Sequence, residues 1–119
     1  MIDLAYEVSK VLSMGLFLYY GLSVLTTDAM VSEFERFGLS RFRRLTGGLE
    51  VLGGVGLAAG YVAPSLVGIA SGGLAALMVL GIATRIRVRD PLVQIIPALV
   101  LAVVNLFILV RALDLGARA

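Results

Sequence analysis

Three long runs of this chain carry almost no charge, and they limit the possible folds more than any other feature. Val11–Thr27 and Pro91–Val110 contain no charged residue, and the 40 residues Leu45–Thr84 contain one, Glu50. A transmembrane helix needs about 20 apolar residues to cross a hydrocarbon core of about 30 Å. Hydrophobic residues make up 60% of the chain and charged residues 15%, and a soluble domain of this size could not bury that much apolar surface. The sequence therefore predicts a small integral membrane protein in contact with the lipid bilayer, and it excludes a nucleic-acid-binding module.

The longest run must contain two helices, because one helix of 40 residues would be about 60 Å long. The break is expected at residues 60–65 (GYVAPS), since glycine and proline interrupt helices and Pro64 disfavours a helical residue before it. Asp3 and Glu7 make the N-terminus acidic, unlike a signal peptide, so the first run is expected to be retained. We predict an all-α transmembrane four-helix bundle, a single domain over residues 1–119, with helices at about 6–27, 45–62, 65–84 and 92–112.

The segment between the first two predicted helices mixes aromatic and charged residues. Phe34, Phe37 and Phe42 alternate with acidic residues and arginines. This pattern predicts an amphipathic segment that lies in the membrane interface. Its arginines serve either as a charged stop signal or as a binding site for anionic lipid head groups.

Basic residues are distributed unevenly between the two predicted sides of the membrane. The loops at residues 28–44 and 85–90 share one side, and the termini share the other. The positive-inside rule therefore predicts a multi-pass protein of the cell (inner or plasma) membrane with both loops cytoplasmic and both termini outside. The loops hold seven arginines, Arg36, Arg41, Arg43, Arg44, Arg85, Arg87 and Arg89, whereas the terminal side holds Lys10, Arg111 and Arg118.

Glycines are concentrated in the second and third predicted helices. Gly56–Gly60 and Gly68–Gly72 are pairs of small residues four apart, on either side of the predicted turn. Such pairs let helix backbones approach closely in lipid. We expect a tight hairpin of these two helices rather than a homodimer face, because the short turn already makes them neighbours. The predicted packing glycines are Gly47, Gly53, Gly54, Gly56, Gly60, Gly68 and Gly72.

Glu50 is the main candidate for a functional residue. It lies about six residues into the second predicted helix, roughly 8–9 Å deep. A carboxyl group there is costly and marks a proton, ion or ligand site, or a structural ion pair. Gly47, Gly53 and Gly54 lie three or four residues away on the same helix face. We therefore expect Glu50 to project toward other helices and away from lipid.

Two interpretations of Glu50 remain open. In the first, it forms an ion pair with Arg44 or Arg85, which precede the second helix and end the third. In the second, it is a protonatable or ligand-binding carboxyl group. Matching of depth along the helices then gives its expected neighbours in the site, which are Tyr19, Ser23 and Gln94.

Enzymatic chemistry finds little support in the sequence. The chain has no cysteine and no histidine, which excludes disulfides, thiolate metal sites and histidine-held haem. It contains no nucleophile–base set and no nucleotide-binding loop. We expect no metal site, no intrinsic cofactor and a non-enzymatic role.

The stretch Arg43–Leu57 (RRLTGGLEVLGGVGL) resembles the second-helix signature of the DoxX-like family of small four-helix membrane proteins. The resemblance continues through Pro64, residues 80–83 (LGIA) and residues 97–101 (PALVL). It implies a four-helix bundle with an amphipathic first loop, and it aligns Glu50 with the family's glutamate. Members often carry a histidine near the end of the third helix, where this chain has Thr84 and Arg85.

The resemblance does not imply one activity. The family takes its name from a subunit of an archaeal thiosulfate:quinone oxidoreductase, and other members resemble accessory proteins of oxidative-stress or thiol-related complexes. Our first hypothesis is an accessory or assembly protein whose site at Glu50 binds a lipophilic ligand or a partner helix. The second is a redox-complex subunit that lends a pocket to quinone, with Glu50, Tyr19 or Gln94 bonded to the ring. The third is a dimeric proton-coupled exporter. A homo-oligomer and a larger membrane complex both remain open.

Overall fold

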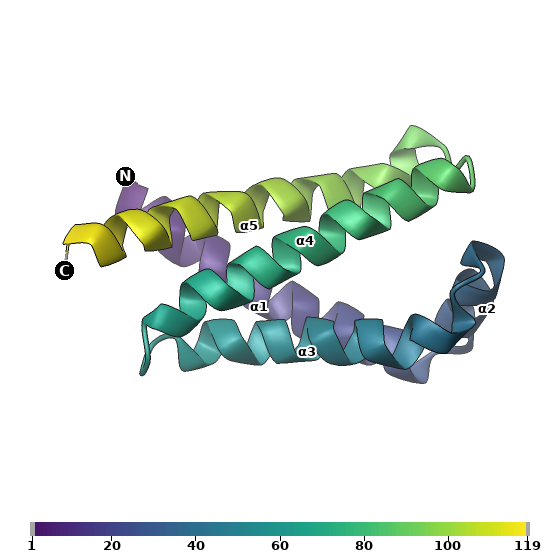
Figure 1. The fold of residues 1–119 in the computed structure, drawn as a ribbon, viewed down its shortest axis with the longest axis horizontal. Coiled ribbons are helices and arrows are strands. Elements are labelled where there is room, and N and C mark those ends of the chain that lie inside the picture. Colours follow the sequence, from purple (N-terminus) through teal and green to yellow (C-terminus); the bar gives the residue numbers. More distant parts are fainter. Residues whose placement is uncertain (1, 119) are drawn as a thin grey trace.

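The computed structural model describes residues 2–118, and nearly all of them are helical (Figure 1). No strand occurs in this range, so the all-α prediction is confirmed. The elements in chain order are α1 (Ile2–Thr26), α2 (Asp28–Phe37), the short 3-10 helix η1 (Ser40–Phe42), α3 (Arg43–Ala59), α4 (Ser65–Arg87) and α5 (Leu92–Arg118).

The four long helices run alternately up and down. α1 packs along α3, α4 packs along α5, and the two pairs meet through α3–α4 and α1–α5 contacts. α1 begins and α5 ends at one end of the molecule, which we call the terminal end (Figure 1). α2 and the α4–α5 loop lie at the other, the α2 end. The molecule is 45 Å long, close to the 40–45 Å of a bilayer with its head groups.

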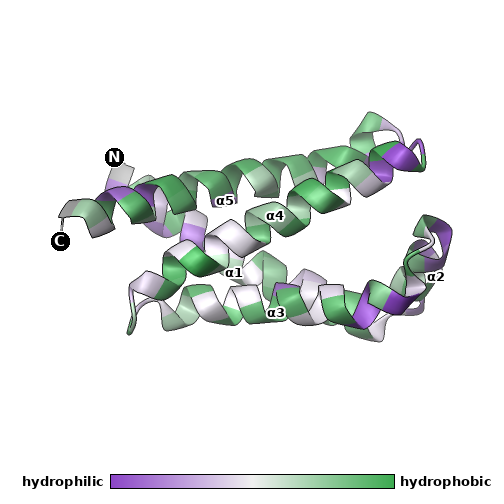
Figure 2. Cartoon of the chain, viewed as in Figure 1, coloured by the Kyte–Doolittle hydropathy of each residue, from purple (hydrophilic) through white to green (hydrophobic). Residues whose placement is uncertain are grey.

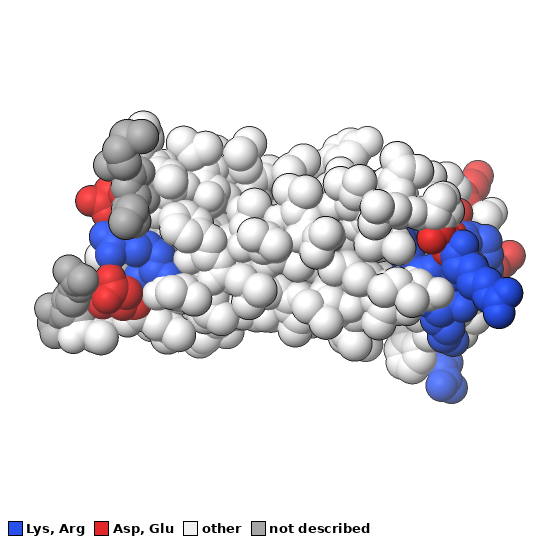
Figure 3. All heavy atoms as spheres, turned by 90° about the horizontal axis from the view of Figure 1, so that it is seen from above, with Lys and Arg blue, Asp and Glu red and all other residues white. Residues whose placement is uncertain are grey.

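The surface is divided in the same way. Charged side chains gather at the two ends, and the face shown in Figure 3 is uncharged between them. Figure 2 shows hydrophobic residues along the middle of α4 and α5 and hydrophilic residues near their ends. The apolar windows of α1, α4 and α5 are only 22–28% buried, so most of their hydrophobic surface faces outward. This is the arrangement of a protein whose solvent is lipid.

The structure corrects the predicted helix count. Residues 2–118 form five α-helices, because the segment predicted to be amphipathic is itself a helix, α2. Three helices, α1, α4 and α5, are long and apolar enough to cross a membrane. α3 falls short of that measure because the turn after Ala59 limits it to 17 residues.

Helix boundaries follow local capping. The side-chain oxygen of Thr27 accepts a hydrogen bond from the Met30 amide at 3.3 Å, which ends α1 at Thr26 and starts α2. α2 ends at Gly38, whose φ of 74° is the left-handed conformation that glycine adopts most easily. α5 continues past the predicted end to Arg118, whose side chain lies outside the described part of the chain.

The predicted packing glycines of α3 face two neighbours. A Cβ atom added at Gly47 or Gly54 would contact side chains of α1, and one at Gly53 or Gly56 would contact side chains of α4. Gly60 lies against the first turn of α4. The glycine-rich helix therefore packs between α1 and α4.

The predicted packing glycines of α4 do not share this role. A Cβ atom at Gly68 would meet no atom within 4 Å, and one at Gly72 would meet only Leu109 of α5, at 3.8 Å. The closest backbone approach involves a glycine that the sequence did not single out. A Cβ atom at Gly21 would lie 2.9 Å from the backbone oxygen of Gly47.

Candidate functional site

A cavity of about 690 Å³ opens between the α1–α3 pair and the α4–α5 pair at the α2 end. Its volume lies within the range of about 300–1,000 Å³ that is typical of ligand sites. α3 and α4 lie close at the turn and separate toward the α2 end (Figure 1). Small residues explain the close end, because Gly53, Gly56 and Gly60 lie there against α4. Toward the α2 end the larger Leu77 and Met78 of α4 line the cavity.

Glu50 lies in the wall of this cavity, on the inner face of α3. It is 6% exposed, and its Oε2 atom has no hydrogen-bond partner within residues 2–118. A buried polar group without a partner is costly, and buried polar groups in proteins are almost always satisfied. The Glu50 carboxyl group is therefore available to a further hydrogen-bond partner in the cavity.

The other buried polar side chains have partners. Ser13 of α1 donates a hydrogen bond to Asn105 of α5 at 3.0 Å, and the Asn105 amide donates to a carbonyl of its own helix. Ser71 donates to a carbonyl in α4. Lys10 forms an ion pair with Glu7 at 3.0 Å. The Ser13–Asn105 bond joins α1 to α5, and the other contacts lie within one helix, so Glu50 alone among these buried side chains has no partner within residues 2–118.

Two of the three residues predicted from depth line the same cavity as Glu50. Ser23 of α1 and Gln94 of α5 line it together with Glu50. Tyr19 does not line it, and this residue is 67% exposed. Tyr20, the next residue along α1, lines the cavity instead. The rotation of α1 therefore turns Tyr20, and not Tyr19, toward the cavity.

Neither candidate arginine pairs with Glu50 in the structure. Arg85 lines the cavity, but its guanidinium contacts Asp90 at 2.8 Å. Arg44 is exposed at the start of α3. Its neighbour Arg43 donates hydrogen bonds to the last carbonyl groups of α1, including that of Val24 at 2.7 Å.

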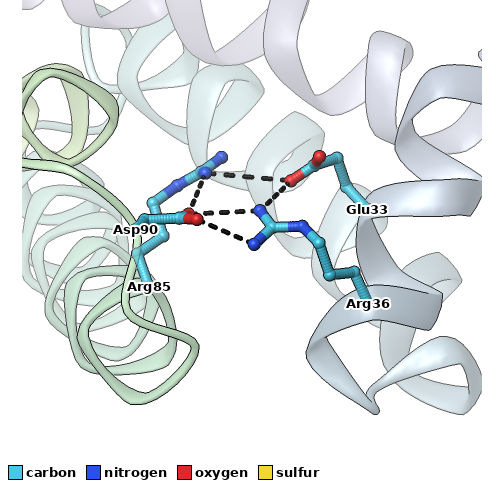
Figure 4. Close-up of polar contacts among 4 residues, drawn as sticks. All are labelled: Glu33, Arg36, Arg85 and Asp90. Atoms are coloured by element: carbon cyan, nitrogen blue, oxygen red, sulfur yellow. Dashed lines mark hydrogen bonds and ion pairs between the residues drawn. The ribbon is translucent and has the colours of Figure 1, made fainter.

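Arg85 instead belongs to a four-residue ionic network that joins α2 to the α4–α5 loop (Figure 4). Arg36 of α2 contacts Asp90 at 2.7 Å and Glu33 at 2.6 Å. Arg85 also approaches Glu33, at 3.8 Å. The sequence offered one signal for this network, the Glu33–Arg36 spacing of three within an amphipathic helix. The loop partner, Asp90, could not be identified without the fold.

Aromatic contacts support the same docking. Phe34 and Phe37 of α2 pack on Val24 of α1, and the ring of Phe37 lies beneath the guanidinium groups of Arg36 and Arg85. Both phenylalanines also line the cavity. α2 is therefore a wall of the site as well as an amphipathic surface helix.

Loss of the Asp90 carboxylate is expected to loosen α2. Hydrogen bonds from Arg36 lower the pKa of Asp90 below its ordinary value of 3.8. The ion pairs of the Asp90 carboxylate therefore contribute fully to the docking of α2 above pH 3.8. This contribution disappears as the pH falls through the lower pKa that Asp90 has when α2 is docked. In Asp90→Asn, we expect amide hydrogen exchange in α2 to become several-fold faster at neutral pH. Hydrogen–deuterium exchange of the protein in nanodiscs, followed by mass spectrometry, measures these exchange rates.

The matched control is Glu35→Gln, which removes an exposed carboxylate of α2 outside the network. It should leave exchange in α2 unchanged. Equal exchange in wild type and Asp90→Asn would show that the aromatic contacts alone hold the helix.

Comparison with known proteins gives one family. A family model described as the DoxX-like family matches residues 8–108, which is most of the chain and includes the whole of α2, α3 and α4. No curated protein and no solved structure gives a significant match.

Proposed function

The chain belongs to the DoxX-like family of membrane proteins, and from this premise we propose that it is an accessory protein that binds a lipophilic molecule at Glu50. The observation that carries the proposal is the unpaired, buried carboxyl group in the wall of a ligand-sized cavity. The cavity walls are mostly apolar, with a few polar groups from different helices. This composition is usual for small-molecule sites.

The proposal includes a fourth membrane span. α3 has 17 residues, or about 25 Å of helix, which is the lower limit for crossing a hydrocarbon core. It packs between α1 and α4, which are both long enough to span. Glu50 then lies inside the membrane, and α2 lies in the interface. The arginine-rich α2 end faces the cytoplasm and the terminal end faces outside, by the positive-inside rule.

The site selects for a hydrogen-bond donor. A carboxylate accepts hydrogen bonds only, and a protonated carboxyl group still has an accepting oxygen. Ser23 and Gln94 supply both donors and acceptors across the same cavity. The molecule bound there has a hydroxyl or amine group near Glu50 and apolar parts against Leu77 and Met78.

Native mass spectrometry of protein extracted gently from its own membrane tests this proposal. Wild type should carry a stoichiometric small molecule, and Glu50→Gln should reduce its occupancy by about tenfold or more, because a charged or strong hydrogen bond is lost. The matched control is Glu35→Gln, the same change at an exposed site. Wild type that carries only random lipid or a bound partner helix would contradict small-molecule binding, as would equal occupancy in Glu50→Gln.

A quinone pocket within a redox complex is the second candidate. The observation in its favour is that Ser23 of α1 and Gln94 of α5 line one cavity with Glu50, and all three can bond to quinone or quinol oxygens. Organic extraction of the purified protein followed by ultraviolet difference spectra would detect a bound quinone. No feature of residues 2–118 favours the third function, a proton-coupled exporter.

A further inference from the structure

A second hollow runs along the outer surface between α3 and α4. It measures about 680 Å³, and every residue that lines it is aliphatic or glycine. Exposed Leu52 and Val55 of α3 form one side, and exposed Ile69 of α4 forms the other. Along α3 it extends from Leu49 to Ala59, about 15 Å of helix. We call this hollow the α3–α4 groove.

The groove borders the Glu50 cavity. Leu49 of α3 and Leu77 and Leu80 of α4 line both. The two spaces therefore adjoin where α3 and α4 begin to separate. The Glu50 cavity has polar side chains from several helices, whereas no charged side chain lines the α3–α4 groove. A single molecule that fills both must be polar at one end and apolar over a long remainder.

We propose that the ligand is a single-chain amphiphile, whose donor-bearing head group contacts Glu50 and whose alkyl or isoprenoid tail lies in the α3–α4 groove. This proposal rests on the proposed function, and it adds the class of molecule and the path of its tail. The tail leaves the cavity sideways and points toward the terminal end. It replaces bulk lipid along a groove that two helices shape.

One glycine makes the groove testable. Gly73 lines the groove, and a Cβ atom there would meet no atom within 4 Å. We therefore expect a phenylalanine at this position to fill the groove without displacing α3. Gly68, on the same helix, also has open space around it but lines neither hollow. Gly68→Phe is thus the matched control for Gly73→Phe.

Two photoreactive amines separate head from tail. The tail probe is hexadecylamine with a diazirine in mid-chain, and the head probe is benzylamine with a diazirine on the ring. Both are applied to the full chain in nanodiscs, and labelled residues are mapped by mass spectrometry. We expect the head probe to label cavity residues and the tail probe to label groove residues such as Leu52 and Ile69.

The variants then give distinct patterns. Gly73→Phe should reduce tail-probe labelling of the groove by about tenfold or more and leave head-probe labelling intact. Gly68→Phe should change neither, and Glu50→Gln should reduce both. Ala76→Phe, a second change that fills the same groove, repeats the test should Gly73→Phe fold poorly.

Groove labelling that survives both filling variants would overturn the tail path, as would tail-probe labels spread evenly over all lipid-facing helices. If head-probe labelling still depends on Glu50 in that case, the proposed function stands. If neither probe depends on Glu50, the proposed function fails as well.

Discussion

Gly21→Ala should destabilise the helix bundle by about 3 kcal/mol, the upper part of the range for overpacking a well-packed interface. The added Cβ atom would lie 2.9 Å from the backbone oxygen of Gly47 and 2.9 Å from the backbone nitrogen of Val51. It would also lie 2.6 Å from a Val51 methyl group. Backbone atoms of a helix cannot move aside as a flexible side chain can, so α1 and α3 must separate.

Gly15→Ala is the matched control, because it places the same methyl group on the same helix. A Cβ atom at Gly15 meets no atom within 4 Å, and alanine favours helix over glycine by up to about 1 kcal/mol. This variant should be as stable as wild type or slightly more stable. Thermal unfolding in detergent, followed by size-exclusion chromatography, measures both. Equal melting of Gly21→Ala and wild type would show that α1 and α3 are not held in close contact.

The uncharged runs predicted most of the helical architecture, because the requirements of the bilayer are strong and nearly independent of sequence detail. Helix ends were harder to predict. In the sequence Thr27 is the last residue of an apolar run, yet in the structure its hydroxyl oxygen caps the next helix, α2. The amphipathic pattern of α2 was visible in the sequence, but its docking depends on Asp90, which lies 54 residues from Arg36.

The candidate site shows the same division between what depth can and cannot predict. Ser23 and Gln94 were selected by their depth along the helices, and both line the cavity of Glu50. Depth alone cannot distinguish Tyr19 from Tyr20, because that choice depends on how α1 is rotated against its neighbours. It also cannot predict the partner of Arg85, which the geometry of the α4–α5 loop decides.

Gly21 was missed for a related reason. In α1 it has no small residue four positions away to form a recognisable pair. What distinguishes it is its position opposite Gly47 on another helix. Conversely, Gly68 and Gly72 form a recognisable pair, but the rotation of α4 turns them away from α3. Spacing within one helix thus identifies possible contact faces, and the crossing of two helices decides which are used.

Gly81→Phe should abolish binding of the proposed ligand while leaving the bundle stable. Gly81 of α4 lines the cavity, and a Cβ atom there meets no atom within 4 Å. A phenylalanine can therefore occupy space that the ligand needs without displacing a helix. We expect ligand occupancy, measured by native mass spectrometry, to fall by about tenfold or more. Melting in detergent should match that of wild type.

Gly48→Phe provides the control, since Gly48 is exposed on α3, has open space around it and does not line the cavity. It should keep its ligand. The variants separate two requirements for binding, the volume of the cavity and the carboxyl group of Glu50. Gly81→Phe removes volume and leaves the carboxyl group in place, whereas Glu50→Gln removes the carboxyl group. Loss of ligand in both Gly81→Phe and Glu50→Gln, and in neither control, requires a molecule that fills the cavity and bonds to Glu50. Retention of ligand in Gly81→Phe would place the bound molecule elsewhere, and Glu50 would then act on it only indirectly.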